Sequence, residues 1–561
     1  MPSQDEWDAV VVGAGIGGLV CAAYLAVAGR RVLVLEQHDV AGGSTHVFRR
    51  RRAYEFDVGV HYLGDCGPDG MLPAIFGGLG LADRVSYREL DPEGFDRIVL
   101  PGVTLDMPAG WPGYRRRLKE AVPQDAAGID TFLDVCAAVA AEMRATLLAD
   151  EQLTVAELVR RTPTVLSWGQ RPLTALFEHC GLSARTRTLL AAQSPNYGMG
   201  PAQVTVAIHA SVTDHYLRGA YYPVGGGQML AAALVEALEA NGGELRTRRR
   251  AERITVEDGA VTGVLLDDGS SVRTDLVVSN ADYPRTVLEL VGAQHFTRRL
   301  AARTSAAVMT YPFASLFVAL DTELPQRPNA NLWWYRGEDV EQDYARLAAG
   351  ELDPVPFLFV SFASLKDPGS GSVCPPGHSN FQVMTLCPPD HAWWGLDEEP
   401  APGTRGTRYR RSDGYLARKR QLTEAMLDAA EEAIGPFRSH IVHLESASPM
   451  TQERYTLATG GTPFGLARWG TEHHRPDTRT TVRGLHVVGA SVRYGSGVTG
   501  VAVGGLACAG QILGRRLVHE VHAGRVLGDP SRLPERAAGW DPLAVSRGLA
   551  RRTARGLARI G

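Results

Sequence analysis

The sequence has little cysteine and little net charge, and it shows neither a signal peptide nor a run long enough to span a membrane. Its seven cysteines are scattered through 561 residues without a Cys-x-x-Cys pair, so neither a metal site nor a disulfide framework is expected. No run of about 18 apolar residues occurs that could span a bilayer. The N-terminus, MPSQDEWDAVVVGAG, lacks the basic and apolar regions of a signal peptide. We therefore expect a protein of the reducing cytoplasm.

The charge balance excludes a large class of partners. The chain carries 58 Lys and Arg against 62 Asp and Glu, a net charge of −4, which argues against a nucleic-acid binder. The run Arg49–Arg52 is then a local feature, which we interpret as a solvated turn at a hairpin tip, with a contact to anionic lipid as the alternative. A length of 561 residues exceeds one ordinary core and predicts two domains.

A dinucleotide-binding unit opens the chain. DAVVVGAGIGGLVCAAYLAVAGRRVLVLEQ is typical of a strand, a glycine-rich turn, a helix and a second strand. Gly13, Gly15 and Gly18 allow the tight turn, the close approach of a pyrophosphate and helix–strand packing, respectively. Glu36 ends the second strand, where a carboxylate can bind ribose hydroxyls, so FAD or NAD is favoured over NADP.

Two further glycines favour FAD over NAD. Gly42 and Gly43 follow Glu36 closely and leave room for the extended ribityl–pyrophosphate chain of a flavin. The segment EFDVGVHYLG, which contains Gly59, is then expected to run back toward the flavin ring.

A second GxGxxG pattern, Gly495-x-Gly497-x-x-Gly500, suggests an NAD(P) site, but its context does not support one. The preceding strand in GLHVVGAS ends too early, and no second strand with a ribose carboxylate follows. We instead expect a helix that begins near Gly497 and Val498 to direct its N-terminus at the flavin ring and to stabilise negative charge there. Gly489 and Ser491, in GLHVVGAS, complete the expected FAD contacts.

The order of these patterns predicts an α/β fold with an interrupted nucleotide domain. We expect a Rossmann-type FAD-binding domain made of residues 1–110, 218–290 and 470–520. Residues 111–217 and 291–469 form an inserted α+β substrate-binding domain, and residues 521–561 form a basic C-terminal tail. Arg547, Arg551, Arg555 and Arg559 recur at every fourth position of that tail, which indicates a basic amphipathic helix for peripheral membrane contact, or else a solvated or disordered tail.

Several motifs resemble the FAD-dependent phytoene desaturase/carotenoid isomerase superfamily, and within it the retinol saturase branch. The resemblance runs from about residue 8 to residue 517 and rests on GGSTHVF, EFDVGVHYLG, HYLRGAYYPVGGG, TDLVVSNAD, FVSFASLKDPG, SPMTQERYTLATGGTPFG and the closing GLHVVGAS…GSGVTG. It implies a two-domain, amine-oxidase-like flavoenzyme that acts on long apolar polyenes. The chain departs from the family at Ser491, where an Asp is usual, and at the arginine-filled hairpin.

The resemblance implies reduction of a C=C bond by hydride transfer from reduced flavin, with proton donation by the protein and an external electron donor or acceptor. The alternatives are a carotenoid desaturase and a redox-neutral cis–trans isomerase; a non-catalytic lipid-binding flavoprotein is least favoured. His61, Tyr62 and Tyr222 are the candidate proton donors, with His209 and His215 behind them. Each could instead be a buried packing residue.

Overall fold

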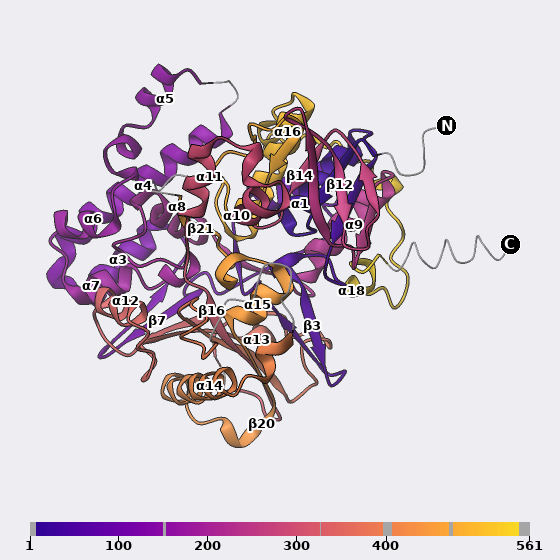
Figure 1. Ribbon diagram of the computed structural model, residues 1–561. Helices are drawn as coiled ribbons and strands as arrows, with labels where there is room; N and C mark the ends of the chain where they lie inside the picture. The colour runs from indigo at the N-terminus through magenta and orange to yellow at the C-terminus, as the bar shows by residue number, and fades with distance from the viewer. Residues whose placement is uncertain (1–6, 150–152, 326, 397–406, 470–474, 549–561) are drawn as a thin grey trace.

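A five-stranded parallel sheet forms the centre of the nucleotide-binding part. The computed structural model describes residues 7–149, 153–325, 327–396, 407–469 and 475–548. The strand order is β10-β2-β1-β14-β22, with bounds Glu244–Thr247, Val32–Glu36, Ala9–Val12, Val277–Ser279 and Leu485–Val487. The sheet therefore joins strands from both ends and the middle of the chain, as the interrupted pattern predicted (Figure 1).

The helices on this sheet pack closely because glycines line their contacts. Helix α1 (Ile16–Val27) contacts α16 (Gly497–Leu513) and α9 (Gln228–Ala240). A Cβ on Gly18 would lie 2.5 Å from the carbonyl oxygen of Gly13, and one on Gly505 would lie 2.2 Å from that of Gly17. A side chain at either position would thus push α1 away from the turn before it or from α16.

A seven-stranded sheet forms the second part. Its order is β20-β16-β19-β18-β17-β7-β8, with bounds Ile441–Ala447, Phe313–Leu320, Ser379–Leu386, Phe357–Ser361, Asn331–Tyr335, Asp96–Leu100 and Val103–Met107. Because β7 and β8 belong to this sheet, the expected domain boundary at residue 110 is wrong; the chain leaves the nucleotide-binding part before residue 96. The boundary lies earlier in the chain because β7 forms hydrogen bonds with β17, a strand of the second sheet that is far away in sequence.

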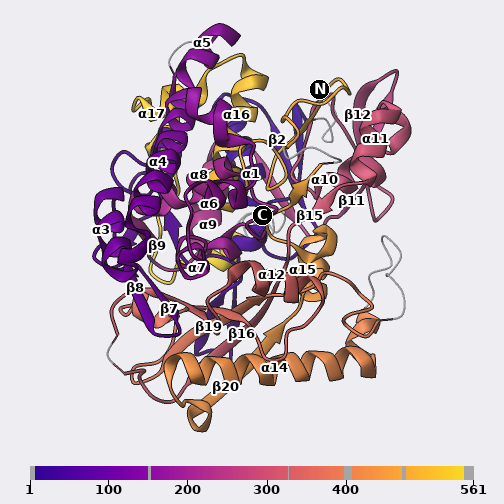
Figure 2. The ribbon, with the colours of Figure 1, turned by 90° about the vertical axis from the view of Figure 1, so that its left-hand side faces the viewer.

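Helices pack against the second sheet and form a separate group between residues 111 and 217. Helix α14 (Asp413–Ile434) packs on β18 and β19 and runs along the lower side of the sheet (Figure 2). Residues 111–217, expected as the first segment of the substrate-binding domain, contain α3 (Trp111–Ala121), α4 (Ala126–Leu148), α5 (Val155–Arg161) and α8 (Val206–Leu217). Among the described helices, none combines the length and the apolar character needed to cross a bilayer.

The arginine run lies in the hairpin of β3 (Val47–Arg50) and β4 (Tyr54–Asp57). Arg51 and Arg52 occupy its exposed tip with left-handed φ values of 53° and 56°. Arg49 and Arg50 lie on β3 and form ion pairs within the protein. The interpretation as a solvated turn therefore holds for only two of the four arginines.

Part of the segment expected to form a basic C-terminal tail, residues 521–548, is packed against the protein. Helix α17 (Leu517–His522) contacts α16 and α2 (Met71–Gly78), and α18 (Pro542–Val545) contacts α9. The rest of the expected amphipathic helix, from Arg551 to Arg559, lies outside the described residues.

Candidate FAD and substrate site

One large cavity lies at the carboxyl ends of the parallel strands and extends to the second sheet. Its volume is about 1880 Å³, which exceeds the roughly 300–1,000 Å³ of an ordinary ligand pocket. Val12, Glu36 and Gly489, each at or just after the end of a parallel strand, line one part of it, and Phe313 and Phe359 of the second sheet line another. The cavity can thus hold a dinucleotide and a second ligand side by side.

The glycine-rich turn forms a cradle that side chains would fill. Gly13 has a φ of +96°, and a Cβ on Gly15 would lie 2.6 Å from Nδ2 of Asn280. Both glycines line the cavity, whereas Gly18 lies behind them, where α1 packs against the turn. Asn280 follows β14 and also lines the cavity. The sequence motif alone gave no reason to expect this amide at the glycine turn.

Glu36 is placed to accept ribose hydroxyls. Its carboxylate lines the cavity and accepts hydrogen bonds of 2.8 Å from the backbone N–H groups of Ala14 and His38. Burial raises the pKa of Glu36, and these two N–H groups oppose that shift. Each oxygen keeps a free lone pair for a hydroxyl, because a carboxylate has about four acceptor positions.

A second glycine turn completes the phosphate end. Gly42 has a φ of +127° and forms a bridge with Gly15, and a Cβ on Gly43 would lie 3.2 Å from Cα of Gly15. Gly59 passes close to Ser44, where a Cβ would lie 3.0 Å from the backbone oxygen. Gly42, Gly43 and Gly59 all line the cavity, so the two glycine turns lie together at the phosphate end.

The N-terminus of α16 opens onto the same cavity. Gly497 and Val498 begin this helix and line the cavity, as do Gly489 and Ser491. Arg475 also lines it and donates hydrogen bonds to the carbonyl oxygens of Ala490, at 2.5 Å, and Phe464, at 3.2 Å. Burial lowers the pKa of Arg475 to about 10, so the guanidinium stays charged at neutral pH. This cation adds to the positive end of the helix, and the sequence offered no signal for it.

The residues that face the parallel sheet thus fit FAD. They supply glycine turns for the pyrophosphate, a carboxylate for the ribose and a positive helix end for the flavin ring. The fit to FAD depends on the glycines of the two turns, because a Cβ at these positions would occupy the space that a dinucleotide needs.

The opposite part of the cavity is apolar, and His61 lies in its wall. The apolar lining side chains come from α8 and the second sheet: Ile208, Val212, Phe313, Phe317, Phe359, Met384 and Leu444. His61 meets the ring of Phe359 edge-on at 5.7 Å, and its buried Nδ1 makes no hydrogen bond within the described chain. Burial, helped by the charge of Lys366, lowers the pKa of His61 to about 3, so its imidazole is neutral.

Tyr62 lines the cavity next to His61 and is held by a buried polar network. Its ring stacks on Tyr216 with centroids 4.1 Å apart. Its hydroxyl donates to Oδ2 of Asp96 at 3.0 Å and accepts from Nδ2 of Asn196 at 2.8 Å. Burial raises the pKa of Tyr62 well above 10, and the charge of Asp96 raises it further, so the phenol keeps its proton.

Asp96 is the centre of this network, and sequence reasoning missed it. It is 0% exposed and accepts further hydrogen bonds from Gln193, at 2.6 Å, and Asn331, at 2.8 Å. Burial raises the pKa of Asp96, while these amides and Tyr62 oppose the shift. Its three partners come from three separate parts of the chain, which explains why no local pattern indicated it.

Tyr222, the third candidate proton donor, is buried behind the cavity wall. It is 1% exposed and its hydroxyl donates a short hydrogen bond to Asp57. Asp57 also accepts from the backbone of Gly227 at 2.8 Å, so the pair braces the turn before α9. The geometry therefore favours a structural role for Tyr222, contrary to the catalytic role we expected.

His209 and His215 are both neutral and hydrogen-bonded. Burial lowers the pKa of each to about 4. Nε2 of His215 accepts from the backbone of Gly64 at 2.9 Å, and Nδ1 of His209 lies 3.2 Å from the hydroxyl of Tyr197. Both satisfy buried polar groups, which supports the packing interpretation.

Known proteins resemble the chain over nearly its whole length. A 13,14-reductase of all-trans-retinol from Macaca fascicularis is 28% identical, with 92% of this chain and 87% of that protein covered. A protein from Danio rerio named inactive all-trans-retinol 13,14-reductase is 25% identical (91% and 87% covered), and a prolycopene isomerase from an Oncidium hybrid is 26% identical (91% and 84% covered). An oxidoreductase structure from Methanosarcina mazei, 18% identical, has a TM-score of 0.58 over 89% of this chain and 99% of that one.

The family model described as flavin containing amine oxidoreductase matches residues 16–513. This region begins just after Gly15 of the first glycine turn and includes the second glycine turn, Asn280, the α16 N-terminus and the apolar part of the cavity. The likeness to the solved structure supports the same fold. The chain therefore belongs to the flavin-containing amine oxidoreductase family, and it is an oxidoreductase whose cofactor is FAD.

Proposed function

We propose that the enzyme reduces one C=C bond of a hydrophobic conjugated polyene or isoprenoid, as the retinol reductases among its relatives are named to do. The observation that supports this most directly is the apolar chamber that continues from the FAD cradle. Its aromatic and aliphatic side chains offer contacts along the length of a polyene. Tyr62 and His61 are the polar side chains beside this chamber for which we propose catalytic roles.

FAD, when bound and reduced, supplies two electrons and one hydrogen to the double bond. The protein must then deliver a proton to the other carbon, and we propose Tyr62 as the donor. Its phenol keeps its proton because burial holds its pKa well above 10, and a carbanion-like carbon can still remove that proton. Asn196 holds the phenol oxygen at the chamber wall, and the O–H, which donates to Asp96 when no substrate is present, turns from Asp96 to the substrate carbon to transfer its proton.

His61 serves the reaction in a different way in this proposal. Because its pKa is lowered to about 3, His61 is uncharged at neutral pH. An apolar substrate can therefore bind beside it without removing water from a charged group. Its edge-on contact with Phe359 leaves Nδ1 without a hydrogen bond among the described residues. We propose that the ring of His61, which lines the cavity, contacts the substrate directly, while its buried Nδ1 stays within the wall.

Stoichiometry separates reduction from the two alternatives. A reductase consumes two electrons per product, a desaturase releases two, and an isomerase needs no net electrons. Isomerisation must be tested because the chain is similar to a prolycopene isomerase. The test is anaerobic: reduce the bound FAD with dithionite, add retinol or a carotenoid, and measure flavin absorbance and product mass. Reoxidation of the flavin with a gain of two hydrogens in the product supports reduction. Unchanged mass with a shifted polyene spectrum contradicts it and identifies an isomerase, and no turnover of any polyene supports a non-catalytic protein.

The role of Tyr62 is tested in the same assay. We expect Tyr62→Phe to bind FAD normally and to slow turnover by roughly 10²–10⁴-fold, the usual contribution of a positioned proton donor. Tyr335→Phe is the matched control, because it also removes a buried hydroxyl of the second sheet, which donates to the carbonyl oxygen of Ala192. Equal turnover in the two variants would assign Tyr62 to packing.

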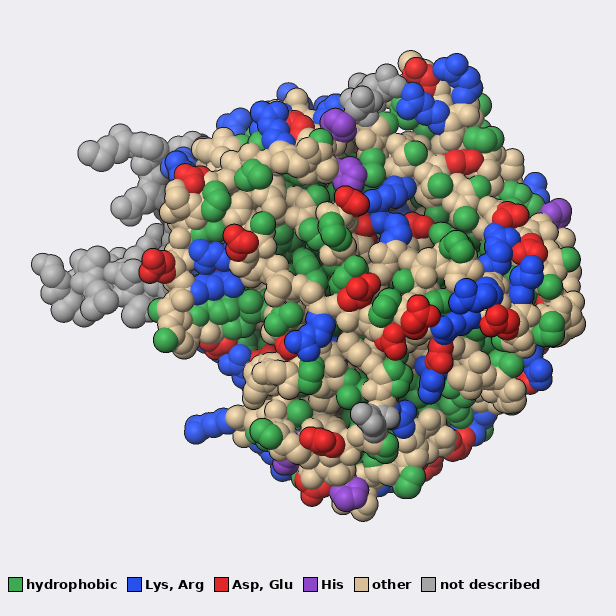
Figure 3. Space-filling view, turned by 180° about the vertical axis from the view of Figure 1, so that it is seen from behind, with side chains coloured by type: hydrophobic (Ala, Val, Ile, Leu, Met, Phe, Trp, Pro, Cys, Tyr) green, Lys and Arg blue, Asp and Glu red, His purple; other side chains and the backbone are tan. Residues whose placement is uncertain are grey.

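We also propose peripheral contact with a membrane, since a polyene dissolves in bilayers and not in water. Six exposed apolar side chains lie on α4, α5 and the turn that follows: Met143, Leu147, Val155, Leu158, Val159 and Leu166. Met143 and Leu147 also line the cavity, so the apolar surface continues into the chamber. Helix α5 stands out from the body and ends in Arg160 and Arg161, which suit anionic lipid headgroups (Figure 3).

Flotation with vesicles of phosphatidylcholine and phosphatidylserine tests this contact. We expect Leu158→Glu to reduce the bound fraction several-fold, because it places a charge among the apolar side chains. Val526→Glu is the matched control, since Val526 is also exposed but lies outside this surface. Truncation after Gly548 measures how much the arginine-rich tail contributes to vesicle binding. If the truncated protein lost all binding while Leu158→Glu kept it, the membrane contact would lie in the tail.

A further inference from the structure

The last eight described residues form a wall of the FAD site. Residues 541–548, named here the C-terminal strap, lie beyond the region that matches the family model, which ends at residue 513. Leu543 and Arg547 of the strap nevertheless line the same cavity as the glycine turns. The family resemblance therefore assigns this part of the wall no function.

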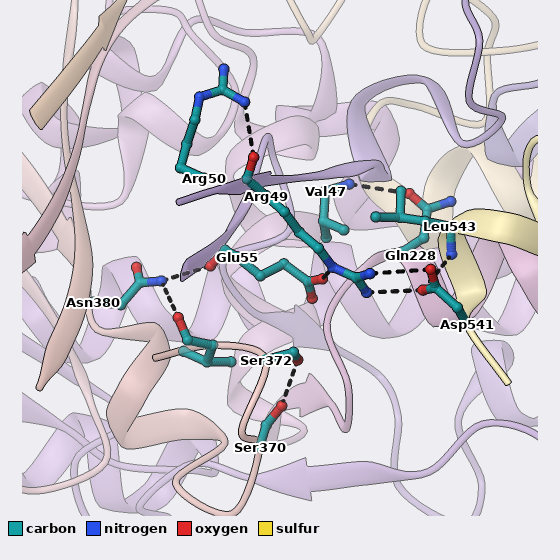
Figure 4. A network of polar contacts seen from close by, with 11 residues as sticks. Val47, Arg49, Arg50, Glu55, Gln228, Ser370, Ser372, Asn380, Asp541 and Leu543 are labelled. Carbon is teal, nitrogen blue, oxygen red and sulfur yellow. Dashed lines mark hydrogen bonds and ion pairs between the residues drawn. The ribbon is translucent and has the colours of Figure 1, made fainter. Parts of the chain in front are cut away.

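Asp541 anchors the start of the strap. Its carboxylate forms two hydrogen bonds with the guanidinium of Arg49, at 2.9 and 3.1 Å (Figure 4). The same carboxylate accepts from the backbone N–H of Leu543 at 3.2 Å and so caps α18. Arg49 is held from its other side by Glu55 at 2.6 Å. One of the four hairpin arginines thus attaches the strap to the β3–β4 hairpin.

Gln228 joins the strap to the second glycine turn. Its fully buried amide accepts from the backbone of Val47 at 3.1 Å and donates to the carbonyl oxygen of Ala41 at 2.9 Å. The same Nε2 donates to the hydroxyl of Ser546 at 2.7 Å. The backbone N–H of Ala41 donates to the carbonyl oxygen of Ser546 at 2.9 Å. Because Ala41 precedes Gly42, the strap is bonded directly to the turn that cradles FAD.

Two side chains of the strap close the wall. Leu543 is 5% exposed and packs in a small cluster with Val40 and Val47. Arg547 lies with Nε 3.6 Å from the carboxylate of Asp39, three residues after the ribose-binding Glu36. Its Nε is buried and makes no hydrogen bond to any part of the chain that the structure describes.

We propose that the C-terminal strap is a component of the FAD site: it closes over the adenosine half of the cofactor, with Arg547 contacting a ribose hydroxyl or a phosphate oxygen, and it must detach before FAD can leave. The strap therefore sets the rate of FAD release. The attached strap also raises the equilibrium affinity for FAD, and by linkage bound FAD stabilises the attached strap by the same factor as that gain in affinity. The proposal concerns cofactor retention and is independent of which substrate is reduced.

Release of FAD from the full-length holoenzyme tests the proposal, measured as the rise in fluorescence of free FAD after dilution. We expect Asp541→Asn to release FAD about threefold faster, because it weakens one partly exposed ion pair while keeping the cap. Leu543→Asp should release it more than tenfold faster, because a buried carboxylate would drive the strap off. Arg547→Met, which leaves the anchors intact, should also release FAD faster.

Asp529→Asn is the matched control. Asp529 also caps a short turn, Pro530–Arg532, by accepting from the backbone of Ser531 at 2.9 Å, but it lies outside the cavity wall. We expect it to release FAD at the wild-type rate. If Asp529→Asn released FAD as fast as Asp541→Asn does, the proposal would be overturned. General loosening of the C-terminal region would then explain both results.

Hydrogen exchange gives a second readout that holds even where a variant folds poorly. In the wild-type protein, FAD should slow exchange at the amide of Ala41 and across residues 541–548, and it should leave residues 529–533 unchanged. Equal exchange of the strap with and without FAD would overturn the proposal, as would wild-type FAD release from folded Leu543→Asp.

Discussion

The ammonium group of Lys366 donates a hydrogen bond of 2.5 Å to the carbonyl oxygen of His61. Lys366 ends α13 (Ala363–Lys366), which follows the second sheet, and it is 1% exposed. Its second partner is the hydroxyl of Ser361 at 2.6 Å. This buried cation therefore ties the second sheet to the segment that carries both His61 and Tyr62 into the cavity wall.

The protonation of Lys366 predicts a pH dependence of stability. Burial lowers its pKa from 10.5 to about 7, against the opposing charges of Asp96 and Asp57. Between these two values the unfolded lysine binds a proton that the folded lysine has lost. The contribution of Lys366 to the free energy of unfolding therefore rises with pH, by up to about 1.4 kcal/mol per unit, and is lost as the pH falls toward 7.

Urea unfolding at pH 7, 8 and 9 measures this effect. We expect the wild type to gain stability relative to Lys366→Met across the series, because methionine cannot titrate. Lys119→Met is the control, since Lys119 forms a surface pair with Asp130 at 2.8 Å. Parallel stability profiles for the wild type and Lys366→Met would show that the folded lysine keeps its proton throughout this range.

Asp96→Asn should destabilise the fold by about 1–3 kcal/mol. Three donors, from Tyr62, Gln193 and Asn331, converge on the carboxylate, and an asparagine would present its own N–H₂ group to one of them. Asp106→Asn is the comparison, because Asp106 forms a surface pair with Arg97, and such pairs contribute about 0–1 kcal/mol. Equal unfolding free energies for the two variants would mean that the Asp96 network is not a stabilising unit.

Gly15→Ala should abolish FAD binding while the chain still folds. The new Cβ would lie 2.6 Å from Nδ2 of Asn280, inside the space that the pyrophosphate needs. Gly77→Ala in α2 is the control, because no heavy atom of the described chain lies within 4 Å of its Cβ position. Flavin absorbance per protein measures the outcome. Full FAD content in Gly15→Ala would place the phosphates elsewhere in the cavity.

Arg52→Gly should stabilise the protein by about 0.5–1 kcal/mol. Arg52 has a φ of 56°, a left-handed conformation that costs an L-residue about 1–2 kcal/mol and glycine almost none, partly offset by the greater freedom of glycine in the unfolded chain. Arg88→Gly, in the exposed strand β6 (Tyr87–Glu89), should have the opposite sign. Thermal unfolding of both variants tests the prediction; a loss of stability in Arg52→Gly would contradict it.

Local patterns in the sequence predicted the first strand–turn–helix–strand unit, which the structure contains, whereas FAD binding by its glycines and Glu36 stays a prediction. Gly13, Gly15 and Glu36 belong to one strand–turn–helix–strand unit, whose spacing is set by backbone geometry alone. The interrupted nucleotide domain was also predictable, because β1, β2, β14 and β22 lie in buried, mainly apolar runs, although β10, with the sequence ELRT, does not. The boundary at residue 110 failed because the pairing of β7 with β17 has no signature within β7 itself.

The missed residues share a different property. Asp96 gains its role from Gln193 and Asn331, and Arg49 gains its role from a carboxylate 492 residues away. Such pairs become visible only when the sheets and the strap are in place. Tyr222 was misjudged for the same reason: its segment borders the site, but its hydroxyl points to Asp57 behind the wall.

The order in which the site's segments leave the ribosome constrains when the cofactor can be loaded. The glycine turn at residues 13–18 is made first, yet its neighbours β14 and β22 and the C-terminal strap come from residues 277–548. At about 5–20 residues per second, translation of 561 residues takes roughly half a minute to two minutes. The complete FAD site therefore cannot form until the segments between residues 277 and 548 have followed the first turn out of the ribosome.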